Sequence, residues 1–173
     1  MDTGNLTTYW TIQTKSKWQE VQTLGYLTGN RAYVDEDFAE AYHWMMTQMK
    51  ERIPGYAGEY PVWLRTERPD LRRSGYLAKG EQGVLLKVTL DAKDVLLSDF
   101  QAWHIVLNNC YMSLELDEDE LYTEEEIRTS WALIFELEQL KASEIWGEPL
   151  DLQGVTGKVL INQLTCVKEF IAR

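Results

Sequence analysis

Residues 95–109, VLLSDFQAWHIVLNN, decide the fold, because an apolar run meets the start of a helix within this stretch. Residues 95–97 are all apolar and predict a short buried strand. Ser98 and Gln101 have the spacing of a capping box, in which the hydroxyl accepts a hydrogen bond from an exposed backbone N–H and the amide reaches back. A helix is therefore expected to begin at Asp99.

The expected helix carries an apolar face and a polar edge. Four apolar residues recur at helical spacing and are expected to face the core: Phe100, Trp103, Val106 and Leu107. His104 lies outside that face. Two interpretations stay open: this is an ordinary corner between a strand and a helix, or Asp99, Trp103 and His104 border a ligand cleft, because strand ends and helix starts often build sites. The second predicts that Trp103 is buried and that His104 lies at the rim of the cleft.

The composition limits the number of domains and the kinds of partner that can be expected. The chain has 173 residues, of which 45% are hydrophobic, so one core and a single domain spanning residues 1–173 are expected. Seven Trp and nine Tyr fit a ligand groove or a partner face as easily as a core. A net charge of −11 argues against broad attachment to nucleic acid or to an anionic membrane, although a local basic site is compatible with it.

Cysteines and apolar runs indicate the compartment. Cys110 and Cys166 are too few for a disulfide framework or a four-thiolate zinc site. Residues 1–10 do not have the pattern of a signal peptide, and no apolar run has the length of a membrane span. We therefore expect a cytoplasmic protein that binds neither membrane nor metal.

The N-terminal unit is a strand followed directly by a short helix. Residues 9–12 predict an opening strand that ends on two polar residues, Gln13 and Thr14. A second capping box begins at Ser16 and predicts the helix, which Gly25 ends in the left-handed conformation. Gln13 and Thr14 are accordingly expected at the end of a central strand, facing a cleft.

The rest of the chain predicts further helices and strands. The expected helices run from the cap Asp35 to about Ile53, and from a third capping box at Thr123 to about Leu140. The expected strands are residues 61–65, 83–90, 150–153, 158–164 and 165–171, with Gly154 and Gly157 as breaks. Helices placed early and late around short strands favour an α+β fold with mixed or antiparallel strands and three to four helices.

One basic segment stands out in this acidic chain. It contains five cations: Arg65, Arg68, Arg72, Arg73 and Lys79. Its arginines either pair with neighbouring carboxylates in a solvated loop, or they form an anion site, since guanidinium groups match phosphate geometry. On the second interpretation the arginines form the most positive surface of the protein.

An acidic stretch, residues 115–126, holds eight carboxylates. It lacks the glycine and the alternating ligands of a calcium loop, so a solvated loop that leads into an acidic first helical turn is expected. Its charge also suits a protein partner.

The usual catalytic motifs are absent. The sequence contains no GxxxxGK[ST], GxGxxG, GxSxG, CxxC or HExxH. Cys110 and His104 would lie on one helix at a spacing that is poor for a nucleophile and its base. Any catalysis is therefore expected to depend on binding and polarisation.

Four blocks of sequence carry a resemblance to a known family: AYHWMMTQMKERI, YPVWLR, RPDLRRSG and VLLSDFQAWHIVLNN. Together they are similar to a bacterial domain-of-unknown-function family, number thirty-eight forty-one, over residues 10–173. This resemblance implies a small cytoplasmic bacterial protein and names no reaction.

A second resemblance concerns YWTIQT, SKWQEVQTLG and YL, whose order is similar to the NAD-binding start of ADP-ribosyltransferases of the DNA-targeting toxin type. It implies NAD as substrate and a role in toxin or phage-conflict biology. In this resemblance Gln13 and Thr14 hold the nicotinamide ribose, Tyr26 stacks near the nicotinamide, and Arg31 contacts the phosphates or the leaving group.

The late catalytic glutamate of that family has no clear match here. Glu148 and Gln153 lie in the corresponding part of the chain, and a glutamine there can position a substrate but cannot act as a base. The first hypothesis is an ADP-ribosyltransferase-like enzyme that binds NAD or another phosphate-bearing small molecule, with Arg65, Arg72 and Arg73 on the diphosphate. The second is a non-catalytic module that binds a protein partner through an aromatic cleft and the acidic face.

Overall fold

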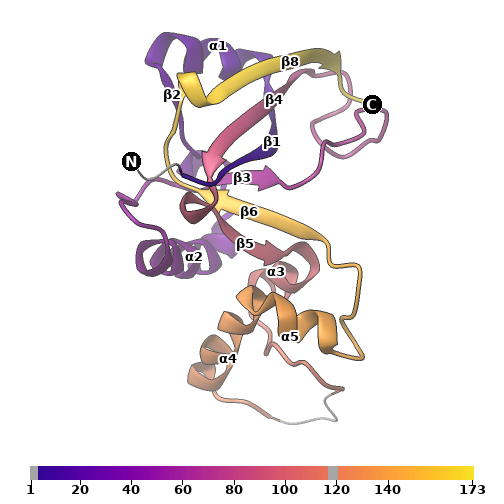
Figure 1. Ribbon diagram of the computed structural model, residues 1–173. Coiled ribbons are helices and arrows are strands. Elements are labelled where there is room, and N and C mark those ends of the chain that lie inside the picture. The colour runs from indigo at the N-terminus through magenta and orange to yellow at the C-terminus, as the bar shows by residue number, and fades with distance from the viewer. Residues whose placement is uncertain (1–3, 117–120) are drawn as a thin grey trace.

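A six-stranded antiparallel sheet of order β5-β6-β3-β1-β4-β8 forms the centre of the computed structural model, which describes residues 4–116 and 121–173 (Figure 1). A small second sheet pairs β2 (Tyr26–Leu27) with β7 (Val159–Leu160). The strands of the large sheet are β1 (Leu6–Thr14), β3 (Val62–Arg65), β4 (Gln82–Asp91), β5 (Leu96–Asp99), β6 (Leu152–Thr156) and β8 (Leu164–Ile171).

Five α-helices are present in the described residues: α1 (Lys15–Leu24), α2 (Ala39–Arg52), α3 (Phe100–Leu107), α4 (Glu124–Ser130) and α5 (Leu137–Ala142). The predicted α+β single domain is confirmed, with an antiparallel large sheet. The helix count exceeds the expected three to four, because the segment predicted as one helix to Leu140 is divided by the 3-10 helix η4 (Trp131–Phe135). Trp131 and Ile134 are both fully buried, and side chains three residues apart lie on one line in a 3-10 helix.

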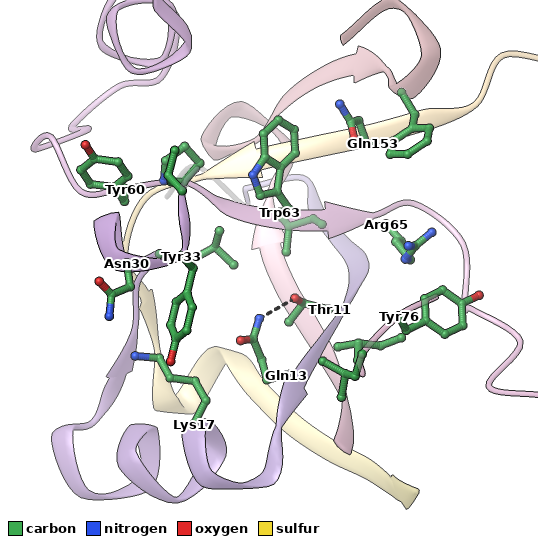
Figure 2. Close-up of a pocket in the computed structure, with 18 of the residues that line it drawn as sticks. Thr11, Gln13, Lys17, Asn30, Tyr33, Tyr60, Trp63, Arg65, Tyr76 and Gln153 are labelled. Carbon is green, nitrogen blue, oxygen red and sulfur yellow. Dashed lines mark hydrogen bonds between the residues drawn. The ribbon is translucent and has the colours of Figure 1, made fainter. Parts of the chain in front are cut away.

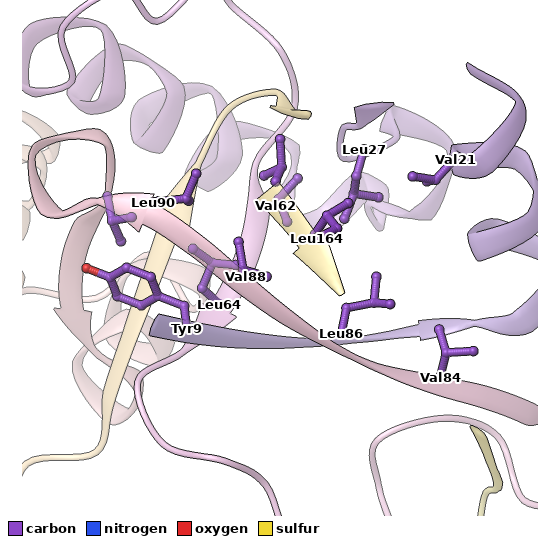
Figure 3. Close-up of a cluster of buried hydrophobic side chains, with 12 residues drawn as sticks. Tyr9, Val21, Leu27, Val62, Leu64, Val84, Leu86, Val88, Leu90 and Leu164 are labelled. Carbon is purple, nitrogen blue, oxygen red and sulfur yellow. The ribbon is translucent and has the colours of Figure 1, made fainter. Parts of the chain in front are cut away.

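One face of the sheet is covered by α1 and by the small sheet. Alternate residues of β4, from Val84 to Leu90, point to this face, as the two-residue period of a strand requires. They pack with Tyr9 of β1, Val21 of α1 and Leu27 of β2 in a continuous apolar cluster (Figure 3).

The other face carries the remaining helices, which gather beside β5 and β6 in Figure 1. Six of the side chains that form its buried cluster are Met45, Met49, Trp103, Val106, Trp131 and Val155. Trp103 is 4% exposed, so its predicted burial is confirmed. Phe100 was expected to be buried as well, and this is wrong, because it lies at the border of the inward face set by Trp103 and Val106 and is 39% exposed.

Two of the three predicted capping boxes are not formed, and other residues cap those helices. Ser98 is buried in β5, where its hydroxyl accepts a hydrogen bond from the Gln153 side chain at 3.3 Å. The cap of α3 is instead Asp99, whose Oδ1 accepts from the Ala102 N–H at 2.8 Å. The cap of α1 is Thr14 rather than Ser16.

Two other local signals agree with the structure, and a third does not. Thr123 and Glu126 form the predicted capping box of α4, with both reciprocal hydrogen bonds present. Gly25 ends α1 with a φ of 87°, in the left-handed region that favours glycine. Gly154 does not break the chain as predicted but lies inside β6, opposite Leu64.

Candidate functional site

A cavity arises where two neighbouring strands of the large sheet separate. β1 pairs with β4 along its full length, from Leu6 opposite Asp91 to Thr14 opposite Gly83. In the described chain, β1 pairs with β3 through a single pair of residues, Trp10 and Arg65. Beyond this pair the two strands diverge, which leaves an opening within the sheet. We call this opening between residues 11–14 of β1 and 62–64 of β3 the seam.

A cavity of about 970 Å³ occupies the seam and the space beside it. Figure 2 shows Gln13 of β1 and Trp63 of β3 on opposite sides of the opening. The far end is closed by the loop after β2, where the Gly29 N–H donates to the Tyr60 carbonyl at 3.0 Å. The walls therefore come from segments that are far apart in sequence. Further lining residues lie in α1, in residues 73–77, in α3 and in residues 151–153.

Aromatic side chains form much of the lining. The buried end is a packed group in which the centroids of Trp63 and Trp103 lie 5.2 Å apart and those of Tyr42 and Trp103 lie 5.7 Å apart. The Trp63 Nε1–H donates to the Tyr42 hydroxyl at 3.2 Å. Burial raises the pKa of Tyr42, and the Trp63 hydrogen bond opposes that change. Tyr33 also lines the cavity, and its side chain is 84% exposed.

The charges at the cavity include three cations. Lys17, Arg65 and Arg73 line it together with two carboxylates, Glu81 and Asp151. Lys17 is paired with Glu20 on its own helix at 3.0 Å. The Arg65 guanidinium lies 4.8 Å from the centroid of the Tyr76 ring. Within the described parts of the chain, neither Arg65 nor Arg73 forms an ion pair, so both are available to an anionic ligand.

Two polar side chains in the cavity have fixed orientations. The Gln13 Nε2 donates to the Thr11 hydroxyl at 3.0 Å, which leaves the Gln13 carbonyl oxygen as an acceptor for a ligand (Figure 2). The His104 Nδ1 lies 2.8 Å from the carbonyl oxygen of Phe100, one helical turn earlier. His104 is half-buried at the α3 side of the cavity.

A family model, described as Domain of unknown function (DUF3841), matches residues 8–128. The chain belongs to this family. No curated protein and no solved structure matches it significantly. The matched residues run from β1 into α4 and contain both sides of the seam.

Several residues that the sequence singled out lie together at the cavity of this DUF3841 chain. Gln13 and Thr14 end β1, a central strand of the sheet, and both line the cavity. The other lining residues among the candidates are Arg65, Arg73, His104 and Gln153. Gln153 is 8% exposed and pairs with Arg65 across β6 and β3.

Four other candidates do not line the cavity. Tyr26 belongs to the small sheet, where the Lys158 ammonium lies 4.7 Å from its ring centroid. Arg31 is bound to Glu36 at 2.7 Å, and this hydrogen bond raises the pKa of Arg31. Glu148 is exposed in the loop before β6.

Arg72 is the fourth of these candidates, and it is engaged by Asp70. Its Nε and an Nη donate to the two carboxylate oxygens of Asp70 at 2.9 and 2.8 Å. These hydrogen bonds from Arg72 hold the pKa of Asp70 well below its usual range. The four arginines of the basic segment thus differ: Arg72 is neutralised by Asp70, Arg68 lies 5.3 Å from the centroid of the Trp10 ring, and Arg65 and Arg73 line the cavity.

Sequence reasoning missed most of the aromatic lining. Trp63 was included in a predicted strand, and its alternation with buried Val62 and Leu64 was the signal that it points to the opposite face. Tyr33 and Tyr76 lie in irregular segments, where no periodicity indicates their direction.

Neither a three-residue metal-binding cluster nor a helix able to span a membrane is found among the described residues. These residues contain no group of three His, Cys, Asp or Glu side chains suited to a metal ion. None of their helices has the length and apolar content that crossing a membrane requires. The acidic stretch expected to bind a partner includes residues 117–120, which lie outside the described residues.

Proposed function

We propose that this DUF3841 chain binds NAD in the seam cavity and acts as an ADP-ribosyltransferase-like enzyme, in a toxin or phage-conflict setting. The observation that carries the proposal is the divergence of β1 and β3 beyond Trp10 and Arg65, which creates a ligand-sized space inside the sheet. A volume of about 970 Å³ is at the upper end of the usual range for ligand sites and leaves room for a dinucleotide.

The lining matches the parts of a dinucleotide. Planar rings bind favourably to aromatic side chains, and Trp63, Tyr33 and Tyr76 supply such surfaces. Phosphate oxygens match the guanidinium fork, and in the described residues neither Arg65 nor Arg73 forms an ion pair, although the charge of Arg73 helps to lower the pKa of Asp70. A diphosphate between two rings therefore finds complementary chemistry in one cavity.

The proposed chemistry needs no protein nucleophile. Cleavage of the bond to nicotinamide creates positive charge on the ribose, and orientation together with nearby polar groups can lower that barrier. Gln13 and Gln153 both line the cavity, and both are held by hydrogen bonds, to Thr11 and Ser98. In this proposal the two glutamines orient the substrate, and Glu148, which does not line the cavity, takes no part.

Thermal unfolding with added ligands tests the proposal. A ligand that binds only the native state at 100 times its dissociation constant stabilises it by about 2.7 kcal/mol. We expect NAD and ADP-ribose to raise the melting temperature more than ATP does. Equal or absent shifts for all three nucleotides would reject NAD as the ligand.

Arg73 and Arg72 provide a matched pair of variants. Arg73→Ala removes a free cation at the cavity, and we expect it to weaken NAD binding by about tenfold, the value for one charged hydrogen bond. Arg72→Ala removes an exposed cation that is bound to Asp70 and should leave the affinity within about twofold. Calorimetric titration of both variants measures the difference, and equal losses would show that only net charge matters.

A binding module without catalysis is the second candidate. It is favoured by Leu116 and Leu121, two highly exposed leucines that flank the acidic residues. Release of nicotinamide separates the two candidates. Tight NAD binding with no nicotinamide release over hours would favour the module.

A further inference from the structure

We propose that the Nε2 atom of His104 accepts the proton of the second substrate, so that the group receiving ADP-ribose is a neutral O–H or N–H nucleophile. This inference rests on the proposed function and names the substrate class of the same cavity. It depends on the position of His104 and on which ring nitrogen carries the proton.

The hydrogen bond of the His104 ring determines its tautomer. Its Nδ1 lies 2.8 Å from the Phe100 carbonyl oxygen, which has no proton to donate. Nδ1 must therefore carry the hydrogen in the neutral ring. The lone pair then belongs to Nε2, the nitrogen that makes no bond to Phe100.

The surroundings also hold this ring in place. The Phe100 ring lies edge to face with the His104 ring, with centroids 4.6 Å apart. Phe100 and His104 both line the cavity. The charged groups that share the cavity are Lys17, Arg65, Arg73, Glu81 and Asp151. The His104 ring packs against the Phe100 ring and is hydrogen-bonded through Nδ1. It can therefore accept a proton at Nε2 without changing its orientation.

The proposed step balances in atoms and charge. The nucleophile's oxygen or nitrogen forms a bond to C1′ of the ribose, and its proton moves to Nε2. The bond between C1′ and the nicotinamide nitrogen breaks, and its electron pair neutralises the positive charge of that ring. His104 leaves the step as an imidazolium and returns the proton to solvent.

This chemistry distinguishes classes of acceptor. A carboxylate is already deprotonated at neutral pH and gains nothing from a base. A hydroxyl, an amide or water carries a proton that must leave as the new bond forms. A base in the cavity therefore indicates acceptors of the second kind, and water is the simplest of them.

The substitution His104→Asn separates the structural role of the ring from its chemistry. In the same helix, the Asn108 Nδ2 donates to the carbonyl of His104, four residues earlier, at 2.7 Å. An asparagine at position 104 can make the equivalent bond to Phe100 but has no counterpart of Nε2. His43→Asn on α2 is the control, because His43 is exposed and does not line the cavity.

Nicotinamide release from NAD in water is the first measurement. We expect His104→Asn to bind NAD with unchanged affinity and to release nicotinamide at least about 100-fold more slowly, the usual contribution of a positioned base. His43→Asn should keep the full rate. A rate that His104→Asn retains overturns the inference alone, whereas no NAD cleavage by the unmodified chain overturns the proposed function with it.

Nitrogen-detected NMR of the two histidine rings is the second measurement, and it does not depend on activity. The expected result is that the neutral form of the His104 ring carries its proton on Nδ1. A neutral ring with its proton on Nε2 would leave no lone pair on that nitrogen and overturn the inference.

Discussion

At the scale of single residues, the buried carboxylate of Asp99 joins a helix to a strand. One oxygen accepts from the Ala102 N–H at the start of α3, and the other accepts from the Asp151 N–H at 2.9 Å, directly before β6. Asp99 is 3% exposed, and the Ala102 N–H that it caps is buried, so this N–H has no water as a ready substitute. This side chain, together with the Phe100 N–H that donates to the Asp151 carbonyl at 2.7 Å, holds α3, and therefore His104, against residues 151–153.

We predict that Asp99→Ala lowers the free energy of unfolding by about 2–4 kcal/mol, because it removes a helix cap and leaves a buried N–H unpaired. Asp35→Ala is the control. Asp35 caps the 3-10 helix η2 (Glu36–Phe38), but it is exposed, so its loss should cost about 1 kcal/mol or less. Urea unfolding of both variants measures the costs, and similar values would contradict the role given to Asp99.

At the scale of elements, Gly154 of β6 leaves room for the side chains of Val95 and Leu97, which lie just before and within the neighbouring strand β5. A Cβ built on this residue would lie 2.6 Å from Cγ1 of Val95 and 3.4 Å from Cδ2 of Leu97. The sequence suggested a break at this glycine, but its role is close packing between strands. The two roles differ only in what lies next to the glycine in space, and these neighbours are far away in the sequence.

We predict that Gly154→Ala destabilises the fold by about 1–3 kcal/mol through this overpacking. Adding Val95→Ala removes the nearest methyl group and should recover part of the loss. The double variant should therefore cost less than the sum of the two single variants. Additive costs in thermal unfolding would show that the contact with Val95 is not the cause.

Local signals predicted the elements well and their ends less well. Thr123 was identified as a cap because the partner in its capping box, Glu126, is also local. Ser98 was misassigned because the hydroxyl binds Gln153, a residue 55 positions away. The 3-10 segment η4 escaped detection because over five residues its period is hard to distinguish from that of an α-helix.

At the scale of the whole molecule, the cavity could be predicted only in part. Gln13 and His104 were identified because polar residues at a strand end and beside an apolar helical face are local patterns. Trp63 and Tyr76 were missed, because they reach the cavity only through the separation of β1 from β3. That separation is a property of tertiary pairing, and no single segment encodes it.

The backbone amides along the seam can also show whether a ligand occupies it. Amides of residues 11–14 and 62–64 that face the seam have no strand opposite them in the described structure, whereas those directed toward β4 or β6 do. Exchange of seam-facing amide hydrogens with deuterium should therefore need only solvent access, without unfolding of the sheet. Any molecule that fills the seam, whatever its identity, should slow exchange at those amides and leave the β4–β8 pairing unchanged. Deuterium uptake measured by mass spectrometry can thus screen for the natural ligand before any reaction is known.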